Sequence, residues 1–136
     1  MDLADVHGIA DDLLVRAGFD LTDAPGARRI AEALHGPGCI FRLPRSLARA
    51  VAWSAVVQGR PRIYLATGLA PEERNHLIGH ETAELELRRL GYDGADIEDA
   101  ADAIGAALVA PRRAFAAVVR DVGADAYGEH VADSGQ

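Results

Sequence analysis

The residues best suited to chemistry lie between His76 and Glu84, a stretch that reads His-Leu-Ile-Gly-His-Glu-Thr-Ala-Glu. If this stretch is helical, His80 and Glu84 lie one turn apart on one face, so both can reach a common ion. Glu81 projects about 100° around the helix from His80, beside that ion. This is the geometry of His-Glu-x-x-His zinc proteases, in which two side chains hold the metal and the glutamate activates water. Glu84 stands here in place of the last histidine.

A third metal ligand must come from another element, and Glu98, 14 residues after Glu84, is well placed on the next helix. Carboxylates bind zinc at about 2.0–2.2 Å, so one imidazole with two carboxylates still forms a metal site. Such a ligand set is harder and more negative than the usual one, which moves the preference toward Mn²⁺ or Fe²⁺. We therefore expect Zn²⁺, or Mn²⁺ or Fe²⁺ in its place, with weakened zinc affinity. We also expect low peptidase activity, because an anionic ligand set acidifies bound water less.

Other roles compete with metal binding at these positions. Glu84 lies four residues before Arg88, which is the favourable order for an ion pair on a helix surface. His76 lies one turn before His80 and is an alternative ligand. If His76 were the first ligand, the next residue would be Leu77, and no general base would stand directly after that ligand. We therefore favour His76 as an exposed residue or as one that contacts a ligand.

Two helices must position these side chains. The first begins at Pro71, which suits a first helical position, and extends to about Leu90. The second carries Glu98, which also suits a helix first turn, and Asp102, which could orient a ligand through a hydrogen bond. The other expected elements are helices at 3–17 and 24–35 and strands at 39–43, 51–57 and 62–65, although residues 46–55 are also rich enough in alanine to begin as a helix. This order predicts an α+β domain with a short, mainly antiparallel three-stranded sheet.

The order of two motifs adds to this prediction. The first runs through Arg62-Ile63-Tyr64-Leu65, a loop, Pro71-Glu72-Glu73-Arg74 and then His80-Glu81, and the second begins at Glu98 and ends in Leu108-Val109-Ala110-Pro111. Together they resemble the strand, the active-site helix and the glutamate-led helix of the ImmA/IrrE metallopeptidase family. The resemblance is specific at these two motifs and extends weakly over residues 3–120.

The resemblance implies a small zincin-like domain at residues 1–122, followed by a polar tail at 123–136. It implies that His80, Glu84 and Glu98 hold the metal and that Glu81 is the general base and acid. Members of this family typically antagonise or cleave helix-turn-helix repressors, often in phage, mobile-element or stress-response circuits, so the implied partner is such a repressor. The alternative is a protein-binding regulatory module of the same fold with a degenerate catalytic site, since Glu84 replaces the family's second histidine.

Composition limits the class of protein further. The 136 residues suit one domain, and 49% of them are hydrophobic, which is ordinary globular composition. A net charge of −7 argues against direct binding of nucleic acid. The single cysteine, Cys39, excludes an internal disulfide and suits a reducing compartment. The sequence has neither a signal-peptide layout nor an apolar run of membrane-spanning length, so we expect a cytoplasmic protein that does not bind membranes.

Overall fold

The computed structural model describes residues 2–21, 25–48 and 50–110, and the predicted tail at 123–136 lies outside this range. Within it the chain is α+β, as predicted, with the elements α1 (Leu3–Arg16), α2 (Ala27–His35), β1 (Ile40–Leu43), the 3₁₀ turn η1 (Arg45–Leu47), β2 (Ala52–Val57), β3 (Arg60–Ala66), α3 (Pro71–Arg89) and α4 (Asp96–Val109). None of the described helices combines the length and the apolar character needed to cross a bilayer.

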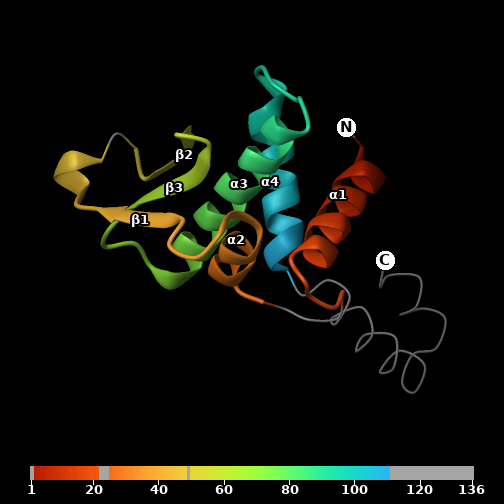
Figure 1. The fold of residues 1–136 in the computed structure, drawn as a ribbon, viewed down its shortest axis with the longest axis horizontal. Coiled ribbons are helices and arrows are strands. Elements are labelled where there is room, and N and C mark those ends of the chain that lie inside the picture. The colour runs from red at the N-terminus through yellow and green to blue at the C-terminus, as the bar shows by residue number, and fades with distance from the viewer. Residues whose placement is uncertain (1, 22–24, 49, 111–136) are drawn as a thin grey trace, which may run out of the picture.

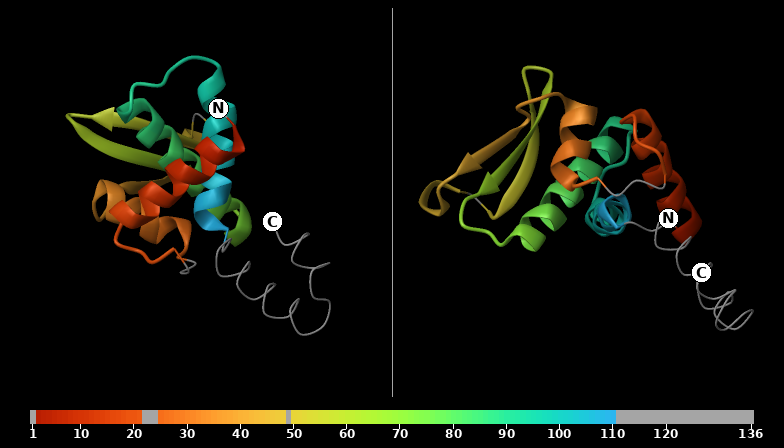
Figure 2. Two further views of the ribbon diagram at one scale, coloured as in Figure 1. Left: turned by 90° about the vertical axis from the view of Figure 1, so that its right-hand side faces the viewer. Right: turned by 90° about the horizontal axis from the view of Figure 1, so that it is seen from below.

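The elements form layers on either side of α3. Figure 1 shows the sheet, α3, α4 and α1 in succession across the molecule, with α2 beside α3. The view from below in Figure 2 shows α2 and α3 against one face of the sheet, while α1 and α4 lie on the far side of α3. The long helix α3 therefore lies at the centre of the fold, between the sheet and the helices α1 and α4.

The sheet has the predicted three strands but differs from the prediction in their directions. The sheet has the order β1-β3-β2, in which β1 runs parallel to β3 and β2 runs antiparallel to it. A mainly antiparallel sheet was therefore wrong: the sheet is mixed. The hairpin between β2 and β3 turns through Gln58 and Gly59, whose φ angles of 53° and 76° match the twist of the two strands. The connection from β1 instead leads to the far edge of the sheet, which leaves the central position for β3.

Helix α3 is buried on both of its faces between Ile78 and Leu87. One face packs with the sheet and α2 in a cluster that includes Ile63, Leu65, Ile78 and Leu85. The opposite face packs with α1, α2 and α4 in a second cluster that includes Leu13, Ile30, Ala83, Leu87 and Ile104. As a result the three glutamates at 81, 84 and 86 are buried together with their apolar neighbours. Buried carboxylates are costly unless they are paired or hydrogen-bonded, so their contacts require an explanation.

Glu86 has a structural explanation. Its carboxylate receives Arg16 of α1 at 2.9 Å and Arg89 at 2.9 Å, and His35 of α2 lies 3.6 Å away. These contacts join α1 and α2 to α3, on the side of α3 away from the residues with predicted chemistry. Glu86 therefore stabilises the arrangement of the helices.

Helices α3 and α4 cross at a pair of glycines. A Cβ atom built on Gly105 would lie 2.7 Å from the backbone of Gly79 and of His80, closer than real Cβ atoms approach backbone. Only glycine at 105 therefore permits this crossing. On α4, Asp102 and Glu98 precede Gly105 by three and seven residues, so they share its face. The close crossing thus brings the acidic face of α4 against His80.

Candidate metal centre

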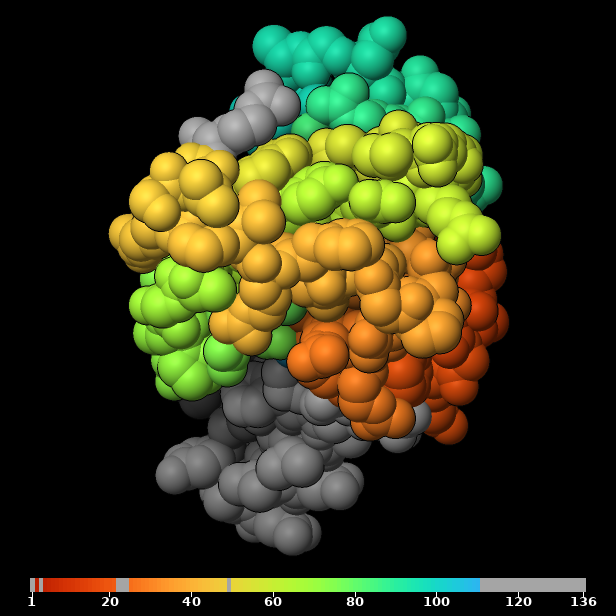
Figure 3. Space-filling view, turned by 60° about the vertical axis from the view of Figure 1, so that its left-hand side comes forward, coloured from red at the N-terminus to blue at the C-terminus, as the bar shows by residue number. Residues whose placement is uncertain are grey.

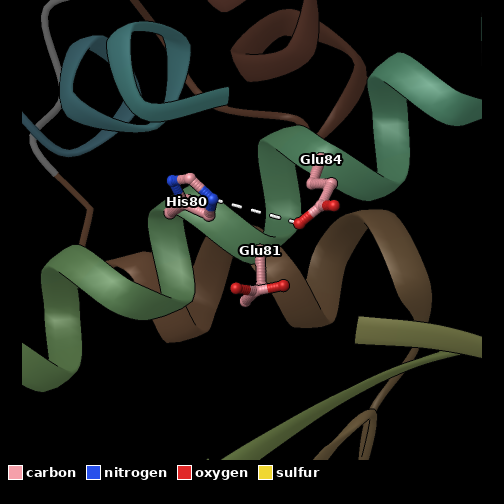
Figure 4. A group of neighbouring side chains, drawn as sticks. All are labelled: His80, Glu81 and Glu84. Carbon is pink, nitrogen blue, oxygen red and sulfur yellow. Dashed lines mark ion pairs between the residues drawn. The ribbon is translucent and has the colours of Figure 1, made fainter. Parts of the chain in front are cut away.

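The side chains of α3 that were predicted to do chemistry come together in the structure. His80, Glu81 and Glu84 each offer one ligand atom, and these atoms all lie within 4.8 Å of one another. Figure 4 shows the imidazole of His80 and the carboxylate of Glu84 along one side of α3, with Glu81 projecting from the turn between them. The four-residue spacing produces this arrangement, because it places His80 and Glu84 one helical turn apart.

Helix α4 completes the surroundings of His80. Nε2 of His80 lies 3.0 Å from Oε2 of Glu98 and 3.9 Å from Oε2 of Glu84, while its Nδ1 lies 3.4 Å from Oδ1 of Asp102. Each ring nitrogen therefore faces a carboxylate. His76 lies 3.3 Å from the same Asp102 oxygen, and its side chain is half exposed. Asp102 thus contacts both histidines, whereas His76 is not part of the cluster formed by His80, Glu81 and Glu84.

These carboxylates determine the protonation of His80. Burial alone would lower the pKa of its imidazole, but the charge of Glu81 and the hydrogen bonds to Glu98 and Asp102 outweigh burial and raise it. Without a metal, the protonated ring can donate to Glu98 from Nε2 and to Asp102 from Nδ1. When Nε2 holds a metal ion instead, a donated Nδ1–H bond to Asp102 fixes the ring's tautomer and orientation.

Glu81 is a strongly perturbed acid. Burial, followed by the negative charge of Glu84, raises its pKa to about 7, although a hydrogen bond with Ser54 acts in the opposite direction. Its Oε1 atom is buried and has no hydrogen-bond partner among the described residues. A buried carboxylate oxygen without a partner is expensive to keep in a fold, and such groups often mark functional sites.

Glu84 has two roles in this structure. Its Oε1 atom accepts a hydrogen bond from Arg88 at 2.6 Å, while Oε2 faces His80. Burial would raise the pKa of Glu84, but the bond to Arg88 and the charge of that residue lower it overall. The ion pair that the sequence suggested and the orientation toward the site therefore occur together, each through a different carboxylate oxygen.

The residues present fit a divalent metal ion. One imidazole and two carboxylates converge, from His80, Glu81 and Glu84, which is a donor set that Zn²⁺, Mn²⁺ and Fe²⁺ accept. The predicted ligand Glu98 contacts His80 but is not part of this group. The partnerless oxygen of Glu81 shows that the cluster is incompletely satisfied without a further group. Two features oppose tight binding: Arg88 competes for one oxygen of Glu84, and the side chain of Glu98 is 61% exposed.

Sequence reasoning missed the contact from the sheet. Ser54 lies in β2 and lowers the pKa of Glu81, 27 residues later in the chain. Register offers a signal only after the fold is known: Ser54 pairs with the buried Ile63 of β3, so both side chains lie on the sheet face that packs against α3.

Comparisons of the chain with known protein families, with curated proteins and with solved structures found no match. Evidence on the activity of this protein therefore comes from the geometry of its own residues.

Proposed function

We propose that this domain is a metal-dependent, peptidase-like hydrolase of the ImmA/IrrE type, in which His80, Glu84 and Glu98 hold the ion and Glu81 is the general base. The observation that carries the proposal is the convergence of His80, Glu81 and Glu84, whose ligand atoms lie within 4.8 Å of one another. Glu98 supports it from α4, at 3.0 Å from Nε2 of His80. A divalent ion bound there would polarise a substrate carbonyl and make water more acidic.

The environment of Glu81 suits proton transfer. A general base works best when its pKa lies near the pH at which the protein operates, and in the metal-free protein burial brings the pKa of Glu81 to about 7. Its Oε1 is buried and has no hydrogen-bond partner among the described residues, so water would reach it only when the site opens to admit a substrate. The carboxyl group would then accept a proton from water and later deliver it to a leaving amine. Ser54 of β2 lies near the same carboxyl group and lowers its pKa.

The edge of the sheet supports a peptide as the substrate. Strand β2 pairs with β3 alone among the described strands, so its other edge presents backbone donors and acceptors. Extended peptides commonly bind by adding a strand to such an edge. Because Ser54 of β2 contacts Glu81, a peptide along this edge would bring a backbone carbonyl close to the cluster. A helix-turn-helix repressor is the proposed partner, and this part of the proposal depends on the family resemblance.

One observation favours a second candidate, a regulatory module that binds its partner without cutting it. The 2.6 Å bond from Arg88 to Glu84 neutralises the carboxylate that replaces a histidine ligand. A site whose second ligand is already paired with arginine binds a cation more weakly than an unpaired one.

Cleavage by metal-loaded protein separates the two candidates. The full chain, supplied with Zn²⁺, Mn²⁺ or Fe²⁺, is incubated with a proteome-derived peptide library and with a repressor encoded beside it, and mass spectrometry locates the cut bonds. The Glu81→Gln variant is the matched control, because it changes one oxygen and leaves His80, Glu84 and Glu98 intact. The enzyme proposal expects cuts by the wild-type protein that the variant does not make. The second candidate would be supported instead if the wild type and the Glu81→Gln variant both cut only at background level and the protein formed a stable complex with the repressor.

A further inference from the structure

A second site candidate lies on another part of the molecule, in a pocket of about 440 Å³ between α2, β1, β3 and the first turns of α3. Figure 3 shows this side of the surface, which is hollowed between the orange residues of α2 and β1 and the light-green residues that lead into α3. The pocket is lined by four arginines, Arg28, Arg29, Arg42 and Arg74. None of its described lining residues is acidic.

This concentration of positive charge is unusual for the chain. Net charge is −7, yet five of the fourteen arginines and none of the twenty-one acids fall within residues 33–71. Arg42 belongs to that acid-free segment, and Arg74 follows it on α3. Neither Arg42 nor Arg74 forms an ion pair with a carboxylate of the described residues. Like charges gathered in one pocket repel one another, so they indicate a site that an anion stabilises.

The start of α2 gives an independent indication. Helix N-termini favour acidic residues because the helix dipole is positive there, but α2 has no acid in its first turn and carries Arg28 and Arg29 instead. Its N-cap is Gly26, which has no side chain to cap the helix, and Asn75 of α3 accepts a hydrogen bond from the backbone N–H of Ala27 instead. An anion bound nearby would complement the dipole and Arg29, whereas Arg28 lies 3.7 Å from Glu32.

Neighbouring contacts hold this end of α2 in place. Oδ1 of Asn75 on α3 accepts a hydrogen bond from the backbone N–H of Ala27 at 2.8 Å, which leaves the amide nitrogen of Asn75 as a donor in the pocket lining. The guanidinium of Arg29 lies 5.1 Å from the centre of the Phe19 ring, a contact that orients it. Asn75 and Arg29 are thus oriented by contacts within the fold.

The floor of the pocket is apolar. Ile40 of β1 is partly exposed there, whereas Leu65 of β3 and Ile78 of α3 are only 0% and 4% exposed. A volume of about 440 Å³ lies in the range of small-molecule sites. A ligand that matches both parts has an apolar body for the floor and a multiply charged group for the arginines. Phosphate esters have this character, since a phosphate monoester carries a charge close to −2 and accepts bidentate bonds from arginine.

We propose that this pocket binds a small phosphate-bearing molecule with an apolar body, with its phosphate on Arg42 and Arg74 and its body against Ile40. The site is separate from the candidate metal centre and does not depend on the function proposed there. Its ligand class is defined by charge and shape, and it includes nucleotides.

Calorimetric titration of the full chain tests this proposal. The probes are orthophosphate, phenyl phosphate, ADP, the tricarboxylate citrate and uncharged adenosine, all at low ionic strength. We expect phenyl phosphate and ADP to bind more tightly than orthophosphate or citrate, and adenosine to give no binding. Arg42→Gln and Arg74→Gln should each weaken the esters at least about tenfold, because each removes a charge-assisted bond.

Arg45→Gln and Arg60→Gln are matched controls, since they remove the same charge from exposed positions of the acid-free segment that do not line the pocket. They should change ester affinity less than about twofold. The proposal is overturned if neither ester binds, if citrate binds as tightly as the esters, or if the controls weaken binding as much as Arg42→Gln does. Circular dichroism of each variant verifies that it remains folded.

Discussion

Replacing Glu81 by glutamine tests whether the ionised, buried carboxylate lowers the free energy of unfolding. Burial raises the pKa of Glu81 from its ordinary 4.5 to about 7. Between these two values the folded protein retains a proton that the unfolded chain releases, so rising pH favours unfolding. Each pKa unit corresponds to about 1.4 kcal/mol, so ionised Glu81 destabilises the fold by about 3 kcal/mol above pH 7. Glutamine at this position does not titrate and avoids that cost.

The assay is urea denaturation of metal-free protein, followed by the fluorescence of Trp53, at several values between pH 5 and pH 8. The difference in unfolding free energy between Glu81→Gln and wild type should rise by about 2–3 kcal/mol toward the alkaline end. Distant titrating groups cancel in this difference, whereas His80 and Glu84, which interact with Glu81, also contribute to it. Glu72→Gln is the matched control, because Glu72 is exposed in the first turn of the same helix, and its difference should stay constant. A difference for Glu81→Gln that varied by less than about 0.5 kcal/mol over this range would refute the reasoning.

Three further predictions concern the same region and the core. Gly105→Ala should destabilise the protein by about 1–3 kcal/mol in urea denaturation, because its Cβ meets backbone at 2.7 Å, whereas Gly8→Ala in open space should stabilise it; equal effects would contradict the close helix crossing. Arg88→Gln should tighten Zn²⁺ binding several-fold in calorimetry by releasing Glu84, and unchanged affinity would count against that competition. Native Cys39 should resist iodoacetamide, since burial raises the pKa of its thiol, and labelling as fast as in urea would contradict this.

Local patterns explain which parts of the fold could be predicted. The helix of α3 followed from Pro71 at its start and from the four-residue spacing of His80 and Glu84, both of which are local signals. Strand order could not be read in this way, because alternation and turn residues identify a strand without identifying its neighbours. β1 and β2 are consecutive in the chain, yet β3 lies between them.

The same limit applies to the sites. His80 and Glu84 are close in sequence, so their convergence was foreseen, and Asp102 lies 3.4 Å from Nδ1 of His80. Ser54 was missed, because its position near Glu81 depends on the packing of β2 against α3. Likewise Arg42 and Arg74 share a pocket only because β1 and the start of α3 are neighbours in three dimensions.

Titration of the metal-stripped chain with divalent ions tests the proposed metal centre directly. Zn²⁺, Mn²⁺ and Fe²⁺ are each titrated into the wild type, into Glu98→Gln and into Asp99→Asn, an exposed neighbouring acid that serves as the control. Wild type and control should bind one equivalent of at least one of these ions, and Glu98→Gln should bind it at least about tenfold more weakly because it loses a ligand. If excess metal gives no binding, or if Glu98→Gln binds as tightly as wild type, the proposed metal centre is wrong.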